Sequence, residues 1–282
     1  MTGGLTLDRL AGAGLETGPA RSAAHALLPR SLRAWLGPVA ALAALVVAVL
    51  GVRYAGHSEP GRVDRWLVRP TADSVRGPWR HVALALDFLG EPAGSAMVIV
   101  AGVAGCLLLR RLRGAVLVAA GSGLAVGTTT LLKHVVGRTI HGPGNLSYPS
   151  GHTAFFTALA LMAALLATGR LGLGRAAGTA LVLAAALVAG AMMGWAEVSL
   201  GAHYPTDALG GWCTALVVTP ATAWLVDRTA DRMTGQVTAR SADRPACLST
   251  GQRGDRATDR VTGQGDGRAD DRPADVGRRE RG

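Results

Sequence analysis

Long apolar blocks separated by short polar segments dominate the first 226 residues. A helix that crosses a bilayer needs about 20 mostly apolar residues. Six blocks come near that length, and we expect each to be a transmembrane helix: 36–56, 92–109, 114–132, 152–169, 176–195 and 206–226. The pattern therefore predicts an all-α fold, a polytopic membrane helix bundle with about six transmembrane helices.

Two flanking segments lack such blocks. Residues 1–35 combine arginines with small residues and are predicted to be a cytoplasmic N-terminal segment, followed by a retained anchor helix and not by a signal cleavage site. Residues 227–282 are a mixture of Arg, Asp, Gly and Thr, which predicts a disordered, Arg/Asp-rich cytoplasmic tail. The expected organisation is one membrane domain, 36–226, between two polar segments.

Basic residues in the short loops predict the orientation. The turns at 110–113 and 170–175 contain arginines without acids, so we expect both to face the cytoplasm. The loop 53–91 then lies outside a multi-pass protein of the cell membrane, although its six arginines oppose the simple rule. Within this loop, residues 79–89 are mildly amphipathic and either lie along the interface or pack as a re-entrant or capping segment.

The amino-acid composition supports a membrane protein and argues against a nucleic-acid partner. Hydrophobic residues make up 49% of the 282 residues, more than is usual for a soluble domain of this length. The net charge of +10 comes without aromatic residues interleaved among the basic ones, so we expect no nucleic-acid partner. Cys106 and Cys213 lie in apolar blocks and Cys247 in the tail, which predicts neither a disulfide framework nor a cysteine zinc site. The expected partners of the protein are membrane lipids, and the sequence does not predict its oligomeric state.

Ionisable residues gather in two segments, 133–152 and 195–207, which the predicted topology brings to the outer side of the membrane. Such groups are costly at membrane depth unless they are paired or functional. Lys133 is the only lysine among 29 Lys and Arg residues. The gathering therefore indicates chemistry at a membrane surface.

The tetrapeptide Pro149-Ser150-Gly151-His152 directly precedes the fourth apolar block. Ser150 is a predicted N-cap, and Gly151 lets a ligand approach the backbone closely. Free N–H groups at a helix start bind anions. In the alternative interpretation these residues only begin a helix, and His152 belongs to its cap.

His203 and Asp207 lie four residues apart, with Pro205 in the first turn of the sixth helix. A carboxylate at this spacing can accept a hydrogen bond from one imidazole nitrogen, which leaves the other nitrogen as a nucleophile. Alternatively, Asp207 caps the helix beside a surface histidine. Lys133 and Arg138 supply the positive charge that phosphoryl transfer needs, or they snorkel to the interface at the end of the third helix.

Lys133 with Arg138, residues 149–152 and residues 200–207 together resemble the three signature motifs of the phosphatidic acid phosphatase type 2 superfamily. The resemblance implies a metal-independent phosphatase that forms a phosphohistidine. It assigns the nucleophile, its orienting carboxylate and the general acid to His203, Asp207 and His152. It assigns phosphate binding to Lys133, Arg138, Ser150 and Gly151. No cofactor is implied, and no metal-ligand spacing such as His-x-x-x-His occurs in the outer loops.

Two places depart from the family pattern. Ile140 and His141 replace the usual Arg-Pro of the first motif, and Ala196 and Glu197 replace the usual Ser-Arg of the third. A carboxylate facing a phosphate dianion is repulsive by several kcal/mol at an effective dielectric of about 20. Glu197 must therefore turn away, be protonated, serve a substrate with extra hydroxyls or a cationic group, or pair with a basic residue, for which we favour Arg138.

The predicted function is an integral membrane phosphatase that hydrolyses a lipid phosphate or polyprenyl (di)phosphate on the outer face. A phosphotransferase that uses an alcohol acceptor is the related alternative. A non-catalytic protein that binds or moves phospholipid is another, and the intact His152, His203 and Asp207 argue against it. A purely structural membrane protein would leave the gathering of polar residues unexplained.

Overall fold

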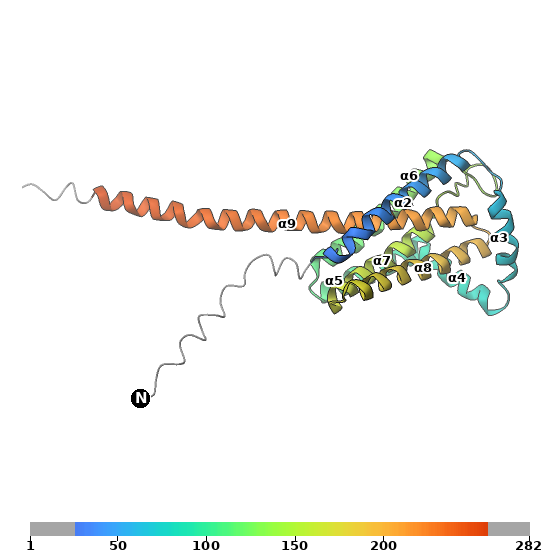
Figure 1. Ribbon diagram of the computed structural model, residues 1–282, viewed down its shortest axis with the longest axis horizontal. Helices are drawn as coiled ribbons and strands as arrows, with labels where there is room; N and C mark the ends of the chain where they lie inside the picture. Colours follow the sequence, from blue (N-terminus) through green and yellow to red (C-terminus); the bar gives the residue numbers. More distant parts are fainter. Residues whose placement is uncertain (1–25, 259–282) are drawn as a thin grey trace, which may run out of the picture. The chain divides into compact units, whose positions relative to one another are not determined.

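The computed structural model describes residues 26–258, with the side chains of Arg30, Ser31 and 237–258 left aside. Every regular element in this range is an α-helix (Figure 1), which confirms the all-α prediction. In chain order they are α2 (Arg30–Tyr54), α3 (Arg62–Asp73), α4 (Pro78–Gly90), α5 (Pro92–Leu108), α6 (Leu112–Val136), α7 (Gly151–Leu171), α8 (Arg175–Ser199) and α9 (Pro205–Thr258).

The predicted membrane spans are present, with one difference. Length and hydropathy make α2, α6, α7, α8 and the first part of α9 capable of crossing a membrane. The predicted span 92–109 is α5. It is long and apolar enough to cross a membrane only when it is taken together with α4, and the angle of the bend between the two helices is 70°. Pro92 begins α5, and a proline lacks the N–H that would continue the preceding helix, so the bend falls there.

α4 covers the amphipathic stretch 79–89, for which the sequence leaves two placements open. The helix packs against α7 and α8. Ala83 and Leu86 are buried in a small cluster with Met193 and Ala196 of α8. α4 is therefore packed against the bundle, as in the second placement, and it becomes part of the wall around the polar residues of α7 and α8.

The last helix is longer than predicted. The sequence predicts disorder from residue 227, whereas α9 continues to Thr258. Buried Asp227 accepts hydrogen bonds from the Leu27 and Leu28 N–H groups and lies 3.6 Å from the Arg113 guanidinium. These contacts fix the beginning of the segment that a count of apolar residues assigns to the tail. The predicted cytoplasmic segment 1–25 and the tail residues 259–282 lie outside the described residues.

Small residues let the helices pack closely around the main core, which draws on α2, α6, α7, α8 and α9. Gly211 of α9 shows why they are needed. A Cβ atom there would collide with the carbonyl oxygen of Ser150, just before α7. Only glycine allows this approach, and it brings the beginnings of α7 and α9 together.

Candidate active site

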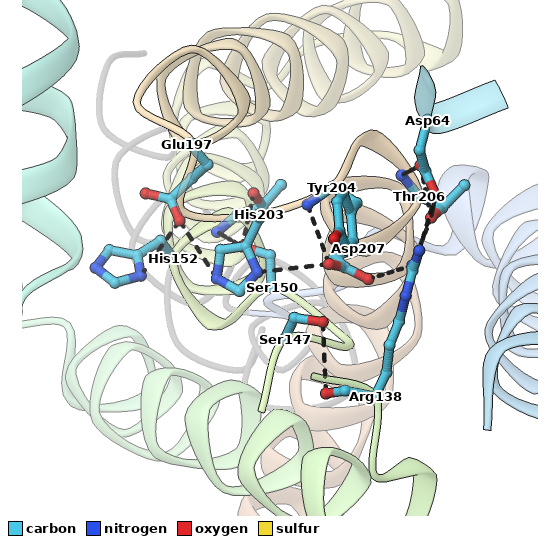
Figure 2. Close-up of polar contacts among 12 residues, drawn as sticks. Asp64, Arg138, Ser147, Ser150, His152, Glu197, His203, Tyr204, Thr206 and Asp207 are labelled. Carbon is cyan, nitrogen blue, oxygen red and sulfur yellow. Dashed lines mark hydrogen bonds and ion pairs between the residues drawn. The ribbon is translucent and has the colours of Figure 1, made fainter. Parts of the chain in front are cut away.

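The two polar segments meet at one end of the helices. α6 ends there, α7 begins there, and the connection between α8 and α9 lies beside them. The Ser150 N–H donates to the Asp207 carbonyl oxygen at 2.9 Å, which links the two segments directly. Figure 2 shows the side chains of His152, Glu197, His203, Asp207 and Arg138 following one another in a row.

Ser150 is the N-cap of α7, as the sequence predicts. Its Oγ accepts a hydrogen bond from the Thr153 N–H at 3.3 Å and donates to Thr153 Oγ1 at 3.1 Å. The side chain is fully buried. Ser150 Oγ is therefore engaged with its own helix, while Gly151 and His152 stand in the first turn, where N–H groups lack helical partners.

His203 lies between two carboxylates. Its Nδ1 is 3.8 Å from Asp207 Oδ2, and its Nε2 is 3.4 Å from Glu197 Oε2 (Figure 2). The side chain is 8% exposed and Asp207 is completely buried. Pro205 begins α9 as predicted, and Asp207 Oδ2 accepts from the Tyr204 N–H at 3.1 Å. The structure thus brings the predicted pair of His203 and Asp207 together, with Nδ1 of His203 facing the Asp207 carboxylate.

His152 reaches the same carboxylate from α7. Its Nδ1 is 3.7 Å from Glu197 Oε2, and its Nε2 is 3.9 Å from Asp87 Oδ1 of α4. Gly90 at the end of α4 lies against the imidazole so closely that a Cβ atom would collide with the ring. Asp87 and Gly90 are not among the site residues that the sequence predicts, and their only local signal is an acid in the amphipathic stretch 79–89.

Glu197 does not pair with Arg138, so the favoured pairing is wrong. Its side chain is fully buried, and neither carboxylate oxygen has a hydrogen-bond partner among the described residues. It lies instead between His152 and His203, because the last turn of α8 directs it toward the start of α7. An unpaired buried carboxylate is costly, so Glu197 is stable in this place only when it is protonated or when a positive group lies beside it.

Arg138 is fully buried on the far side of Asp207. Its guanidinium donates to Asp207 Oδ1 at 2.6 Å, Thr206 Oγ1 at 2.7 Å and Asp64 Oδ2 at 2.8 Å (Figure 2). It also lies over the rings of Tyr54 and Tyr204, at 4.1 and 4.6 Å from their centroids. The sequence predicts that Arg138 binds phosphate. In the structure, its hydrogen bonds to Asp64, Thr206 and Asp207 bind it to the protein itself.

Asp64 of α3 completes this network and was not anticipated. Besides Arg138, it accepts hydrogen bonds from the N–H groups of Thr206, at 3.0 Å, and Gly61, at 2.9 Å. Burial raises the pKa of the Asp64 carboxyl, but the Arg138 guanidinium and these N–H groups outweigh it, and the net pKa is below its ordinary value. Asp64 is therefore held as a carboxylate that fixes Arg138, and through it Asp207.

Lys133 lies in the last turn of α6 and is partly buried. It is close enough to Asp207 and Glu197 to interact with both electrostatically. Unlike Arg138, it has no short ion pair among the described residues. Its positive charge is thus available to offset the negative charge of Glu197 and to attract a phosphate.

Comparison with known proteins places part of the chain in a family. A family model described as the PAP2 superfamily matches residues 114–231. This part of the chain is a PAP2 superfamily domain. A crystal structure described as the first transmembrane PAP2 type phosphatidylglycerolphosphate phosphatase from Bacillus subtilis has a similar fold, with a TM-score of 0.51 and 20% identity. The similarity covers 68% of this chain and 96% of that one. No curated protein matches the chain.

The PAP2 domain supplies the following residues of the site: His152, His203, Glu197, Asp207, Lys133 and Arg138. Asp64 and Asp87 come from α3 and α4, which precede the matched residues. The chain is therefore a multi-pass membrane protein with the fold of a PAP2 membrane lipid phosphatase, and two earlier helices add carboxylates to the end of the domain where its motifs meet.

Proposed function

We propose that this chain is an integral membrane phosphatase that removes phosphate from a lipid phosphate or polyprenyl (di)phosphate through a phosphohistidine on His203. The observation that carries the proposal is the orientation of that imidazole. Nδ1 points to the Asp207 carboxylate, and Nε2 points to the side on which His152 lies. The 3.8 Å from Nδ1 to Asp207 is longer than a hydrogen bond. A small rotation that lets Nδ1 donate to Asp207 leaves Nε2 available for attack.

The reaction takes place in two steps. His203 Nε2 attacks phosphorus, the bond from phosphorus to the lipid oxygen breaks, and protonated His152 gives its proton to that oxygen. A water molecule then attacks the phosphohistidine, His152 takes a proton from the water, and the phosphorus–nitrogen bond breaks to release phosphate. Asp207 stabilises the positive charge that develops on the His203 ring.

Phosphate binding rests on Lys133 and on the N–H groups at the start of α7, at Gly151 and His152, with Ser150 shaping that start as N-cap. Arg138 contributes through Asp207, which it holds at 2.6 Å. Glu197 lies where it would repel phosphate unless its charge is balanced. Protonated His152, as the general acid must be, supplies that balance at 3.7 Å.

A lipid substrate is supported by an apolar groove of ≈ 480 Å³ between α2, α6 and α9. The groove is lined by residues such as Val47, Gly51 and Leu132, and it reaches Tyr148, two residues before Ser150. An acyl or prenyl chain fits such a surface at membrane depth. Because the similar crystal structure is described as a phosphatidylglycerolphosphate phosphatase, a glycerophospholipid phosphate is the first substrate to test.

The test is phosphate release by purified protein in detergent with EDTA, from phosphatidylglycerol phosphate, phosphatidic acid, polyprenyl phosphate and polyprenyl diphosphate. We expect release from at least one of these, together with an acid-labile, alkali-stable phosphoenzyme when the reaction is quenched during turnover. Folded protein that releases no phosphate from any of them would refute the proposal. Release that requires an added alcohol would identify the phosphotransferase alternative.

We further propose that the site faces the outside of the cell membrane. α6 begins and α7 ends at the arginine-containing turns around 110–113 and 170–175, at the end opposite the site, and such turns favour the cytoplasm. With Cys247 replaced by Ser, a membrane-impermeant maleimide added to intact cells is expected to label Ser58→Cys and not Ala176→Cys. Both positions are exposed, on opposite ends of the helices. The reverse labelling pattern would place the site on the cytoplasmic side.

A further inference from the structure

Glu197 stands at the centre of a group that the phosphatase mechanism does not account for. Its buried Oε2 lies 3.4 Å from His203 Nε2 and 3.7 Å from His152 Nδ1. The ligand atoms of these three side chains all lie within 4.8 Å of one another. Both Glu197 oxygens lack a hydrogen-bond partner among the described residues. Two imidazoles and one carboxylate therefore present unused lone pairs to one small volume.

The separations suit a shared metal ion. Zinc binds imidazole nitrogen at about 2.0–2.1 Å and carboxylate oxygen at about 2.0–2.2 Å, so that tetrahedral ligand atoms stand about 3.3–3.5 Å apart. The two separations measured from Glu197 Oε2 are 3.4 and 3.7 Å. Small side-chain rotations would close the difference. Two histidines and one glutamate are, in addition, a ligand set that catalytic zinc sites use.

The outer nitrogens of both imidazoles point to carboxylates. His152 Nε2 lies 3.9 Å from Asp87 Oδ1, and His203 Nδ1 lies 3.8 Å from Asp207 Oδ2. Histidines that bind metals usually donate their second N–H to a carboxylate, which orients the ring and makes the ligand nitrogen more basic. Here both outer nitrogens face such a carboxylate, at separations longer than a hydrogen bond, and the nitrogens facing Glu197 are free to bind.

The charge around Glu197 also favours a cation. Asp87 and Glu91 of the α4–α5 bend act on it with further negative charge, and Lys133 is the basic side chain that acts against them. Asp87 and Glu91 also approach His152 as a second group of metal-binding type. Because that group shares His152 and is more exposed, we assign the ion to the buried group.

We propose that His152, Glu197 and His203 bind one divalent transition-metal ion, with zinc as the species that fits the ligands. The ion takes the lone pair of His203 Nε2, so metal binding and phosphoryl transfer to that nitrogen exclude each other. This consequence rests on the proposed function, whereas the site itself does not. Bound zinc therefore inhibits the phosphatase, and the metal-free protein is the active form.

The test measures metal and activity separately. The chain is purified without a polyhistidine tag and with Cys247 replaced by Ser, stripped with EDTA and desalted. Zinc retained per chain and the visible absorption of bound Co²⁺ report the site, and phosphate release at increasing zinc, relative to each variant's own zinc-free rate, reports the inhibition. The variants are Glu197→Gln and His152→Ala, with exposed Glu59→Gln as the matched control.

We expect one zinc per chain and a Co²⁺ spectrum in the parent and in Glu59→Gln, and more than about 100-fold weaker binding in Glu197→Gln, since loss of a ligand exceeds the effect of an outer-shell change. Zinc is expected to inhibit the parent and to spare Glu197→Gln. Equal metal binding by the parent, Glu197→Gln and His152→Ala would overturn the site. A higher rate of phosphate release with added zinc would overturn the inference that metal binding and phosphoryl transfer to His203 exclude each other. If no lipid phosphate is hydrolysed, the metal measurements still decide the site.

Discussion

His203→Ala is expected to lower phosphate release from the best lipid substrate by roughly 10⁴-fold or more, the scale seen when an enzyme loses its nucleophile. Among the described residues, neither His152 nor Lys133 is placed to replace it. His152 has its nitrogens turned toward Glu197 and Asp87, and Lys133 carries its charge as an ammonium group. The phosphoenzyme that accumulates in the parent should disappear in the same variant.

Two further variants give this result its meaning. His81→Ala removes an exposed histidine of α4 that makes no contact described for the site, and should retain the parent's rate. Asp207→Asn keeps His203 but removes the carboxylate that orients it, and should lower kcat by up to about 10⁴-fold, as loss of the orienting Asp does in a serine protease triad. Phosphate release by His203→Ala at the rate of His81→Ala would exclude His203 as nucleophile.

The sequence predicts what depends on local order. An apolar block long enough to span a membrane becomes a helix in every case, and Ser150 and Pro205 begin helices as their side chains dictate. The convergence of the segments containing His152 and His203 also follows. In a series of antiparallel helices every second connection lies at the same end, and these two segments are connections of that kind. These features need only the order of the helices and the chemistry of their first residues.

The partners of the site residues could not be predicted in the same way. Asp64 bonds Thr206 across 142 positions of sequence, and Asp87 reaches His152 only because the bend at Pro92 lays α4 against α7 and α8. No spacing rule connects such residues. The sequence marks Glu197 as anomalous, but the predicted pairing with Arg138 is wrong because Asp64 and Asp207 already surround that guanidinium.

Arg138→Met is expected to destabilise the protein by about 3–5 kcal/mol, the cost of breaking a buried ion pair from one side. The substitution keeps much of the side-chain volume but leaves the buried Asp64 and Asp207 without their shared cation. The thermal unfolding midpoint in detergent measures the effect. Exposed Arg69→Met of α3 is the matched control and should unfold like the parent. Equal midpoints for the two variants would show that the network does not stabilise the fold.

Adding Asp64→Asn separates the pair from the rest of the network. In the Arg138→Met background this change removes one of the two unbalanced acids, so the double variant should lose less stability than the two single losses combined.

The pH dependence of stability follows from the lowered pKa of Asp64. A group whose pKa is lower in the folded state stabilises the fold above its unfolded pKa, 3.8, and this contribution is lost as the pH falls through the folded pKa. The advantage of the parent over Asp64→Asn should therefore be constant near neutral pH and shrink from about pH 5 to about pH 3. An advantage that does not change over this range would mean that Asp64 contributes through packing and not through its charge.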